Sequence, residues 1–304
     1  MIVIPPITIT PAMLTSSTVP YPDASVGEVA WVSGATCAVG LERVSNYRIY
    51  SCVQAHTGRT TPPESDDAYW LEKCFANRYA MFDTLRSTKT VATSPLTVVI
   101  TPGQRVDSIA LMGMAAYEAD INLAQGVTTL FDEVINLVER PTRGWYDYFF
   151  RKITTRENEI RFRLPPVSNG VITVTLTSPV GNVQIGTLAL GMQEYLGRVQ
   201  FAPTDDADNY SKITRSVIDG SATLIPSRNV PKTSQTILVE KADVPRIRAM
   251  RDRLNATPAI WCGLDEQVTS PYYQSLLING IYRRMPISLK HLNHAEISLE
   301  LEEI

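Results

Sequence analysis

Short runs in which apolar and polar side chains alternate recur along much of the 304-residue chain. The segment 159–164 alternates Ile160, Phe162 and Leu164 with two arginines, and the segment 297–301 alternates three apolar residues with polar ones. Such alternation gives a strand one buried face and one solvated face, as in an antiparallel sheet. Gly and Pro turns separate the runs, so the pattern predicts a mainly β fold.

The repeated short strands predict an antiparallel β-sandwich of jelly-roll type over residues 76–200. Within it, the segment 168–186 has the composition of a strand, a tight turn and a second strand. Residues 201–304 are predicted to form a C-terminal α+β domain, rich in strands and with one α-helix.

That helix is predicted over the segment 242–258, "ADVPRIRAMRDRLNATP". Asp243 is the expected N-cap, and the helix should stop before Pro258. The stripe that would face a core is formed by Ile247, Met250 and Leu254. Four arginines lie largely on the other side, where a solvated face that docks on an acidic neighbour is favoured over a phosphate site.

The first 75 residues divide into two parts. Residues 1–25 are rich in proline, which rules out a helix and predicts an extended arm. This arm is either a disordered terminus or a strand that adds to a neighbouring subunit. Residues 26–75 predict a small β module, which is too short to fold without its aromatic side chains in the core.

The densest aromatic segment is "RPTRGWYDYFFRK", residues 140–152. The favoured interpretation is a strand whose alternate rings fill a sandwich core. The other is a platform of flat rings for a sugar or a protein partner. Its rings are Trp145, Tyr146, Tyr148, Phe149 and Phe150.

Composition excludes several classes of protein. The chain has 44% hydrophobic and 19% charged residues and a net charge of -3, so no basic face for nucleic acid is expected. No apolar run approaches the ~20 residues of a membrane span. The first residues lack a basic segment and are interrupted by prolines, so they do not resemble a secretory signal. We therefore expect the chain to fold in a cytoplasm, with its cysteines as thiols.

Signatures of catalysis are missing from the sequence. It contains no HExxH, GxSxG, GxxxxGK[ST] or GxGxxG pattern. A glycan-cleaving enzyme would need two carboxylates at a set separation, and none of the many Asp and Glu residues is marked for that role. We therefore predict no enzyme activity and no cofactor.

Two groups of residues have the side chains of a metal site without its usual spacing. One group has the residue types of a zinc site with three cysteines and one histidine: Cys37, Cys52, His56 and Cys74. The favoured interpretation is that these residues act as small buried hydrophobic side chains. An open alternative is that Cys37 and Cys52 face each other on neighbouring strands and form a disulfide in an oxidising medium. The three carboxylates of "PTDDADNYSK", residues 203–212, are favoured as a solvated turn over a calcium site. No metal is predicted.

The stretch 30–70 resembles the small chitin-binding-like carbohydrate-binding modules. The matching positions are Trp31, Gly40, Val44, Tyr47, Tyr50, Pro62 and Trp70, whereas Cys37 stands where that family usually carries Tyr. The resemblance implies contacts to a glycan or a partner through Trp31, Tyr47, Tyr50, Tyr69 and Trp70.

The chain as a whole resembles tailed-bacteriophage virion proteins that carry such a module near the N-terminus. The similar segments occur in order, from "CFANRYAMFD" (74–83) through "VDSIALMGMAA" (106–116) to "LLINGIYRRMPI" (276–287). This implies a structural protein of the neck, collar or tail, located in the virion, which contacts other virion proteins and forms a homo-oligomer. The alternative is a receptor- or glycan-binding fibre or baseplate protein that contacts a host surface glycan.

Overall fold

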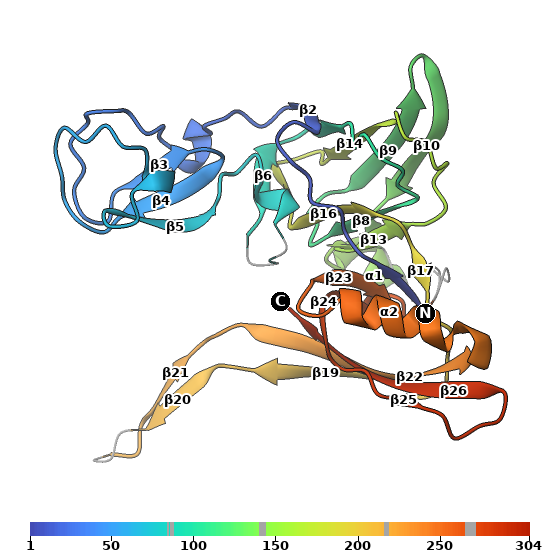
Figure 1. The fold of residues 1–304 in the computed structure, drawn as a ribbon. Helices are drawn as coiled ribbons and strands as arrows, with labels where there is room; N and C mark the ends of the chain where they lie inside the picture. The colour runs from blue at the N-terminus through green and yellow to red at the C-terminus, as the bar shows by residue number, and fades with distance from the viewer. Residues whose placement is uncertain (84, 86–87, 140–143, 216–218, 265–271) are drawn as a thin grey trace. The chain divides into compact units, whose positions relative to one another are not determined.

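The computed structural model of the chain (Figure 1) describes all residues except 84, 86–87, 140–143, 216–218 and 265–271. The prediction of a mainly β fold with antiparallel sheets and one main helix is confirmed. The described chain divides into two compact units, one of residues 1–7 with 190–304 and one of residues 8–189.

The unit of residues 8–189 is built like a β-sandwich. One sheet has the order β10-β9-β14-β7-β2, and a second has the order β13-β8-β16. The first sheet contains β10 (Thr128–Asn136), β9 (Glu118–Gln125), β14 (Val171–Thr177), β7 (Leu96–Ile100) and β2 (Leu14–Ser17). The second contains β13 (Glu159–Arg161), β8 (Ser108–Met112) and β16 (Thr187–Gly191).

Alternation along the strands of the first sheet places one face in a core. Every second residue of β7 is buried, from Leu96 to Ile100, and β14 repeats the pattern from Ile172 to Leu176. The unit also contains two strand pairs, β6 (Thr90–Thr93) with β15 (Asn182–Ile185), and β11 (Val138–Glu139) with β12 (Thr154–Thr155). The predicted strands of segment 168–186 are therefore present as β14 and β15, but they pair with different partners.

The small β module lies at the start of the same unit. Its sheet contains β3 (Glu42–Ser45), β4 (Arg48–Cys52) and β5 (Trp70–Phe75), with short 3-10 turns at Ala24–Val26, Pro63–Ser65 and Ala80–Phe82. Asn46 and Tyr47 join β3 to β4 and both have positive φ. Two such residues form the tight turn whose twist matches that of the two strands.

The other unit is one antiparallel sheet with a helix on it. The sheet has the order β17-β1-β23-β24-β26-β22-β18, and β19 and β25 pair with its members. Its strands are β17 (Glu194–Tyr195), β1 (Ile2–Ile4), β23 (Ala259–Cys262), β24 (Leu277–Arg284), β26 (His294–Glu303), β22 (Asn229–Glu240), β18 (Arg198–Val199), β19 (Thr204–Asn209) and β25 (Ile287–Ser288). Two 3-10 turns, Lys241–Asp243 and Gln274–Leu276, belong to the same unit.

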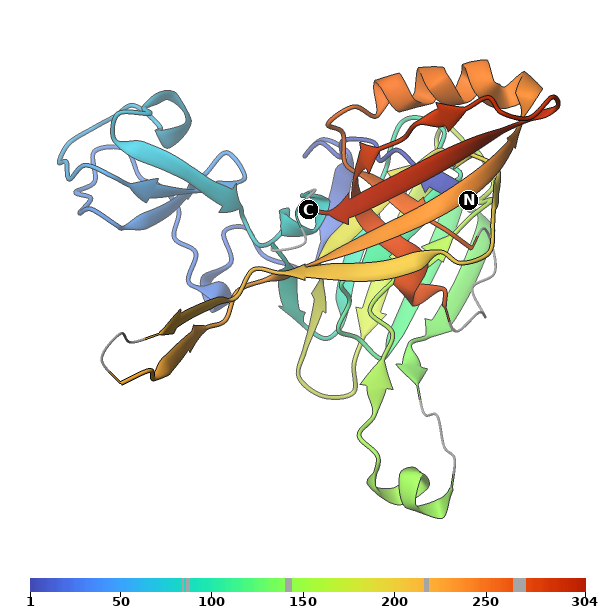
Figure 2. The same ribbon diagram turned by 90° about the horizontal axis from the view of Figure 1, so that it is seen from below.

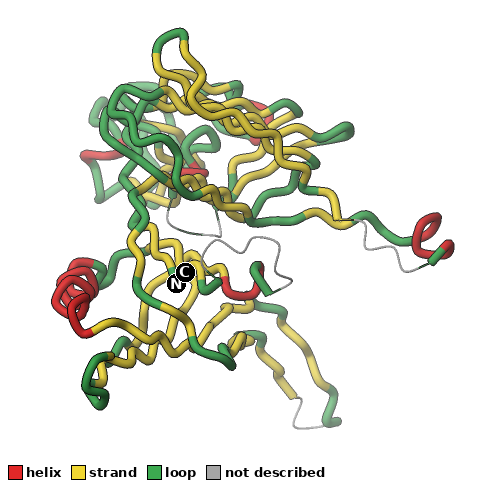
Figure 3. The backbone as a smooth tube through the Cα atoms, turned by 90° about the vertical axis from the view of Figure 1, so that its right-hand side faces the viewer, coloured by secondary structure: helices red, strands yellow, loops and turns green. Residues whose placement is uncertain are grey.

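The helix α2 (Val244–Arg253) covers one face of this sheet, as Figure 3 shows. Its predicted stripe is confirmed, because Ile247, Met250 and Leu254 are buried in the core between helix and sheet. The Asp243 side chain makes no capping hydrogen bond, since a 3-10 turn leads directly into the helix. Gly280 on β24 is required, because a Cβ there would lie 2.0 Å from the Glu302 carbonyl oxygen of β26.

The division of the chain differs from the predicted one at its start. Residues 1–7 belong to the unit of residues 190–304, where β1 lies between β17 and β23 of its own chain. Ile2, Val3 and Ile4 are all buried, as expected of a strand inside a sheet rather than of an extended arm. Beyond Ile4 the chain stays paired, with Ile7 N–H donating to the Leu190 carbonyl oxygen at 2.8 Å.

The buried position of β1 predicts that this strand stabilises the distant end of the chain. Val3→Ala should lower the free energy of unfolding of that unit by about 2 kcal/mol, because two methyl groups leave the core around α2. The measurement is amide hydrogen exchange of β23, the neighbour of β1. Thr8→Ala at an exposed position is the control and should change stability by less than about 0.5 kcal/mol. Unchanged exchange in Val3→Ala would contradict the pairing.

Candidate functional site

The most unusual surface of the described chain is a stalk that ends in an aromatic helix. Strands β11 and β12 form the stalk, and α1 (Trp145–Phe150) is the helix that they carry. Figure 2 shows α1, in green, projecting away from the strands of its own unit. We call the residues 144–153 the aromatic tip.

The rings of the aromatic tip are in solvent. They are between 66% and 82% exposed, and they belong to Trp145, Tyr146, Tyr148, Phe149 and Phe150. The prediction of a strand with rings in a sandwich core is therefore wrong. Consecutive aromatic residues on a helix point to several sides, and none of the residues of α1 is buried.

The rings contact one another instead. Trp145 stacks on Phe149 with ring centroids 6.4 Å apart, and Tyr146 lies over Phe150 at 5.1 Å. Tyr148 meets Phe149 edge to face at 5.1 Å. Pairs at i and i+4 on two sides of one helix turn show that the apolar surface runs around α1 rather than along one stripe.

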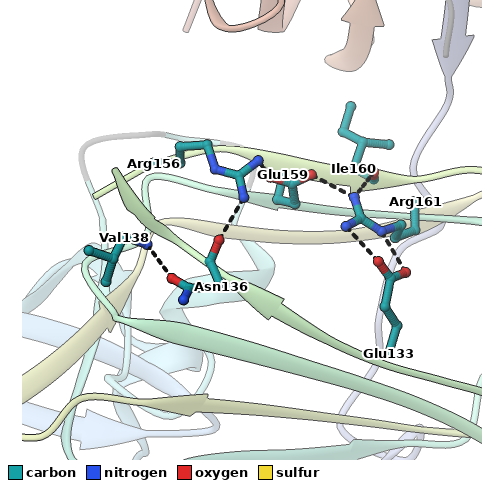
Figure 4. A network of polar contacts seen from close by, with 7 residues as sticks. All are labelled: Glu133, Asn136, Val138, Arg156, Glu159, Ile160 and Arg161. Carbon is teal, nitrogen blue, oxygen red and sulfur yellow. Dashed lines mark hydrogen bonds and ion pairs between the residues drawn. The ribbon is translucent and has the colours of Figure 1, made fainter. Parts of the chain in front are cut away.

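An ion-pair network lies at the base of the stalk (Figure 4). Arg161 of β13 binds both oxygens of Glu133 on β10, at 2.7 and 2.9 Å. The same guanidinium donates to Glu159 at 2.5 Å. Because β10 and β13 belong to different sheets, Arg161 ties the two sheets of the unit together.

The same network reaches the first residues of the stalk. Arg156 lies 2.9 Å from the second oxygen of Glu159 and donates to the Asn136 carbonyl oxygen at 2.6 Å. The Asn136 side chain in turn accepts from the Val138 N–H of β11 at 2.8 Å. The stalk therefore begins at a fixed point of the sandwich.

Electrostatics explain why Glu159 is tolerated in the interior. Its side chain is fully buried, and its two arginine partners compensate the lost hydration of the carboxylate. For Arg161, burial alone lowers the pKa, but the hydrogen bonds and charges of Glu133 and Glu159 outweigh it and raise the pKa above its ordinary value.

The aromatic residues predicted for glycan or partner contact do not share one surface. Trp70 and Tyr50 are buried in the core of the small module with Cys37 and Cys52, so neither ring is open to a sugar. Trp31 and Tyr69 are half-buried and pack against that core. The Arg59 guanidinium covers the Tyr69 ring at 3.6 Å and donates to both carboxylate oxygens of Asp66.

The remaining predicted contact residue, Tyr47, lies in a different cluster. Its ring packs against Tyr21 at 5.4 Å and Tyr79 at 4.7 Å, where the small module joins the sandwich. The Tyr21 hydroxyl also accepts the Tyr47 N–H at 2.7 Å. Tyr47 thus helps to hold the module in place, while its role in glycan contact stays a prediction.

A buried polar cluster completes this junction. Glu28 accepts from the Asp23 N–H at 2.7 Å and from the Asn77 N–H at 2.6 Å. The Asn77 amide donates to Asp23 at 2.7 Å and to the Val91 carbonyl oxygen at 2.8 Å. For Asp23, burial alone raises the pKa, but the hydrogen bonds from Ser25 and Asn77 outweigh it and bring the pKa below its ordinary 3.8.

Sequence reasoning missed both polar clusters. The sequence "PDAS" around Asp23 carries the signal of a turn, because an Asp side chain that accepts the N–H two residues on forms such a turn, and Asp23 does this with Ser25. Glu28 and Glu133 carry no local signal, because their partners Asn77 and Arg161 lie on distant segments. Glu159 has both of its arginine partners within three residues, but this spacing does not mark the carboxylate as buried. The side-chain oxygen of Asn77 also accepts the Val91 N–H at 2.9 Å, and both oxygens of Glu28 accept a backbone N–H.

The candidate metal residues are placed as follows. In the part of the chain that the structure describes, no group of three or more His, Cys, Asp or Glu side chains is arranged to hold a metal ion. Cys37 and Cys52 are buried free thiols, and burial raises the pKa of Cys52. Asp205, Asp206 and Asp208 lie along strand β19 and not in the predicted turn, and Asp208 pairs with Lys232.

The arginine face of α2 is engaged within its own unit. Arg246 lies 3.5 Å from Asp243 and donates to the Tyr195 carbonyl oxygen at 2.8 Å. Arg253 pairs with Glu194 of β17. These contacts fix the helix to the sheet edge. The sequence interpretation had these arginines dock on an acidic neighbour instead.

Comparisons with known proteins leave the family open. No protein-family model matches the chain, and no curated protein matches it significantly. No helix among the described residues is both long enough and apolar enough to cross a membrane.

The network at the stalk base predicts an asymmetric response to two matched substitutions. Glu159→Gln should lower the free energy of unfolding by about 3 kcal/mol, because it leaves two arginines without their buried counter-charge. Glu133→Gln changes a half-exposed partner of the same Arg161 and should cost about 1 kcal/mol. Urea unfolding of both variants measures the difference, and equal losses would contradict the buried role of Glu159.

The lowered pKa of Asp23 predicts a pH effect of definite sign. A carboxyl with a depressed pKa contributes stability well above pH 3.8, and this contribution is lost as the pH falls through and below that value. The free energy of unfolding of Asp23→Asn should therefore be about 1–3 kcal/mol lower than that of the wild type at neutral pH, and it should fall less steeply in acid. Urea unfolding across this pH range measures both. Asp67→Asn, at an exposed site, is the control and should follow the wild type.

Proposed function

We propose that this chain is a structural subunit of a bacteriophage neck, collar or tail, which acts through contacts with further copies of itself and with other virion proteins. The resemblance described above supplies the class of protein. The observation that carries the proposal is a two-stranded ribbon, β20 (Lys212–Arg215) with β21 (Ala222–Ile225), which extends beyond the sheet of its own unit (Figure 1).

The ribbon presents an apolar pair on one of its faces. Ile213 and Leu224 are directly opposite each other in the strand register, and they are 62% and 64% exposed. Thr214 lies opposite Thr223 on the other face. All described residues of the two strands are exposed, so the ribbon has no core of its own.

A lone two-stranded ribbon is at best marginally stable in water. Its apolar face and its unpaired strand edges gain most when a second chain covers them. In a symmetric assembly, each copy both offers its ribbon and receives that of a neighbour, so one weak contact is repeated around the assembly. This supports a subunit whose function is assembly.

The ribbon generates a prediction about self-association. The double variant Ile213→Asp, Leu224→Asp should weaken association of the purified chain by about tenfold or more, because charge replaces the apolar contact. Sedimentation velocity over a wide concentration range measures it. The matched control, Thr214→Asp with Thr223→Asp, places the same cross-strand charges on the other face and should associate like the wild type. A wild-type chain that stays monomeric throughout would contradict the proposal.

Location in the virion needs a separate measurement. Mass spectrometry of purified particles should detect the chain in a fixed ratio to the other virion proteins. Electron microscopy with an antibody to the chain should label one position on the particle. Absence from intact particles would leave an assembling protein outside the virion and would remove the phage role.

A further inference from the structure

The aromatic tip has a property that subunit assembly leaves unexplained. Its five rings are all more than three-fifths exposed, and they form one contiguous apolar surface because the Phe149–Phe150 contact joins the two ring pairs. Single exposed apolar side chains are common on soluble proteins, but a contiguous patch of this kind marks a binding surface. Neither the sandwich core nor the small module uses these rings.

The distribution of the rings around α1 discriminates between occupants. A helix that docks in a protein groove offers an apolar stripe on one side and polar residues on the other. On α1 the pairs Trp145–Phe149 and Tyr146–Phe150 lie on different sides, and Asp147 is the helix's one charged side chain. A helix that is apolar nearly all round fits a medium that surrounds it, which is the case in a lipid layer.

The dimensions and residue types fit the same medium. Six helical residues span about 9 Å, which matches the roughly 5–10 Å depth of the interface between headgroups and acyl chains. Trp and Tyr combine an apolar ring with a polar atom and are enriched at that depth. The tip carries one Trp and two Tyr together with two Phe.

Charge at the rim of the tip selects the lipid. Arg151 and Lys152 follow α1 directly and are exposed. The acidic residue of the helix, Asp147, is offset by Arg151 at 3.7 Å. The tip is therefore basic at its edge although the chain as a whole has a net charge of -3, and this complements anionic headgroups.

We propose that the aromatic tip inserts into the interface of a lipid bilayer that contains anionic lipids. The rings enter the apolar boundary, Arg151 and Lys152 stay among the headgroups, and the stalk with its ion-pair base holds the tip clear of the sheets. This goes beyond the assembly role and does not depend on it, since the contact is made by a different unit from the ribbon.

The test uses the full chain and vesicles of phosphatidylcholine, with or without phosphatidylglycerol. We expect co-sedimentation with the anionic vesicles and a blue shift of Trp145 fluorescence, because the other tryptophans are buried or half-buried. The double variant Phe149→Ser, Phe150→Ser should bind the anionic vesicles about tenfold more weakly or worse. Phe201→Ser is the matched control, since Phe201 is an exposed aromatic of the other unit, and should bind like the wild type.

Further outcomes decide the proposal. Lys152→Glu should remove the preference for anionic vesicles. Circular dichroism should show that the variants remain folded, because all the substituted side chains are in solvent. The proposal is overturned if the wild type binds neither kind of vesicle, or if the Phe149 and Phe150 substitutions leave binding unchanged. It is also overturned if the Phe149 and Phe150 substitutions abolish self-association and not vesicle binding, because the tip would then contact a second copy of the chain.

Discussion

The pairing of β1 with β23 is the constraint on which the architecture depends. It joins residues 2–4 to residues 260–262 in one sheet, so the first residues of the chain complete a unit made mostly of its last. The whole unit of residues 8–189 is therefore an insertion between two strands of another sheet. Both faces of β1 are buried, and its side chain at Val3 enters the same core as helix α2. Without that strand, β23 would become an open edge.

The local pattern of the sequence predicted elements well and partners poorly. The stripe of Ile247, Met250 and Leu254 has the period of a helix that covers a core, and the alternation along 297–301 has the period of a strand with one buried face. Both statements concern neighbours a few residues apart. The partner of β1 lies near the other end of the chain, and no local period encodes it. For the same reason β14 and β15 were recognised as strands but not as members of different sheets.

The failures at functional positions have a shared physical cause. Five aromatic residues within six positions are compatible both with a buried strand and with an exposed tip. Composition alone does not say whether a core lies nearby. Likewise, Arg161 alternates with Ile160 as a solvent-facing residue would. It instead pairs with Glu133 of the other sheet and with the buried Glu159 of its own strand. Two rings of the small module show the opposite case, because Trp70 and Tyr50 fill a small core that has few other large side chains.

The apolar side chains of this molecule include two groups, those that form the cores and those that are exposed on the ribbon and the aromatic tip. Each unit has a core built from its own strands, so neither the ribbon β20–β21 nor the aromatic tip is needed to close one. Exposed apolar side chains that no core uses lower the solubility of a protein. Their benefit comes from binding a partner or a surface that covers them. The buried charges at the stalk base fit this division. They need exact geometry to offset their desolvation, and such geometry gives the tip a fixed origin on the sandwich. A tip on a fixed base loses less conformational entropy when it binds than one on a free loop, so the rings can act at a surface although the helix has a single turn and a half.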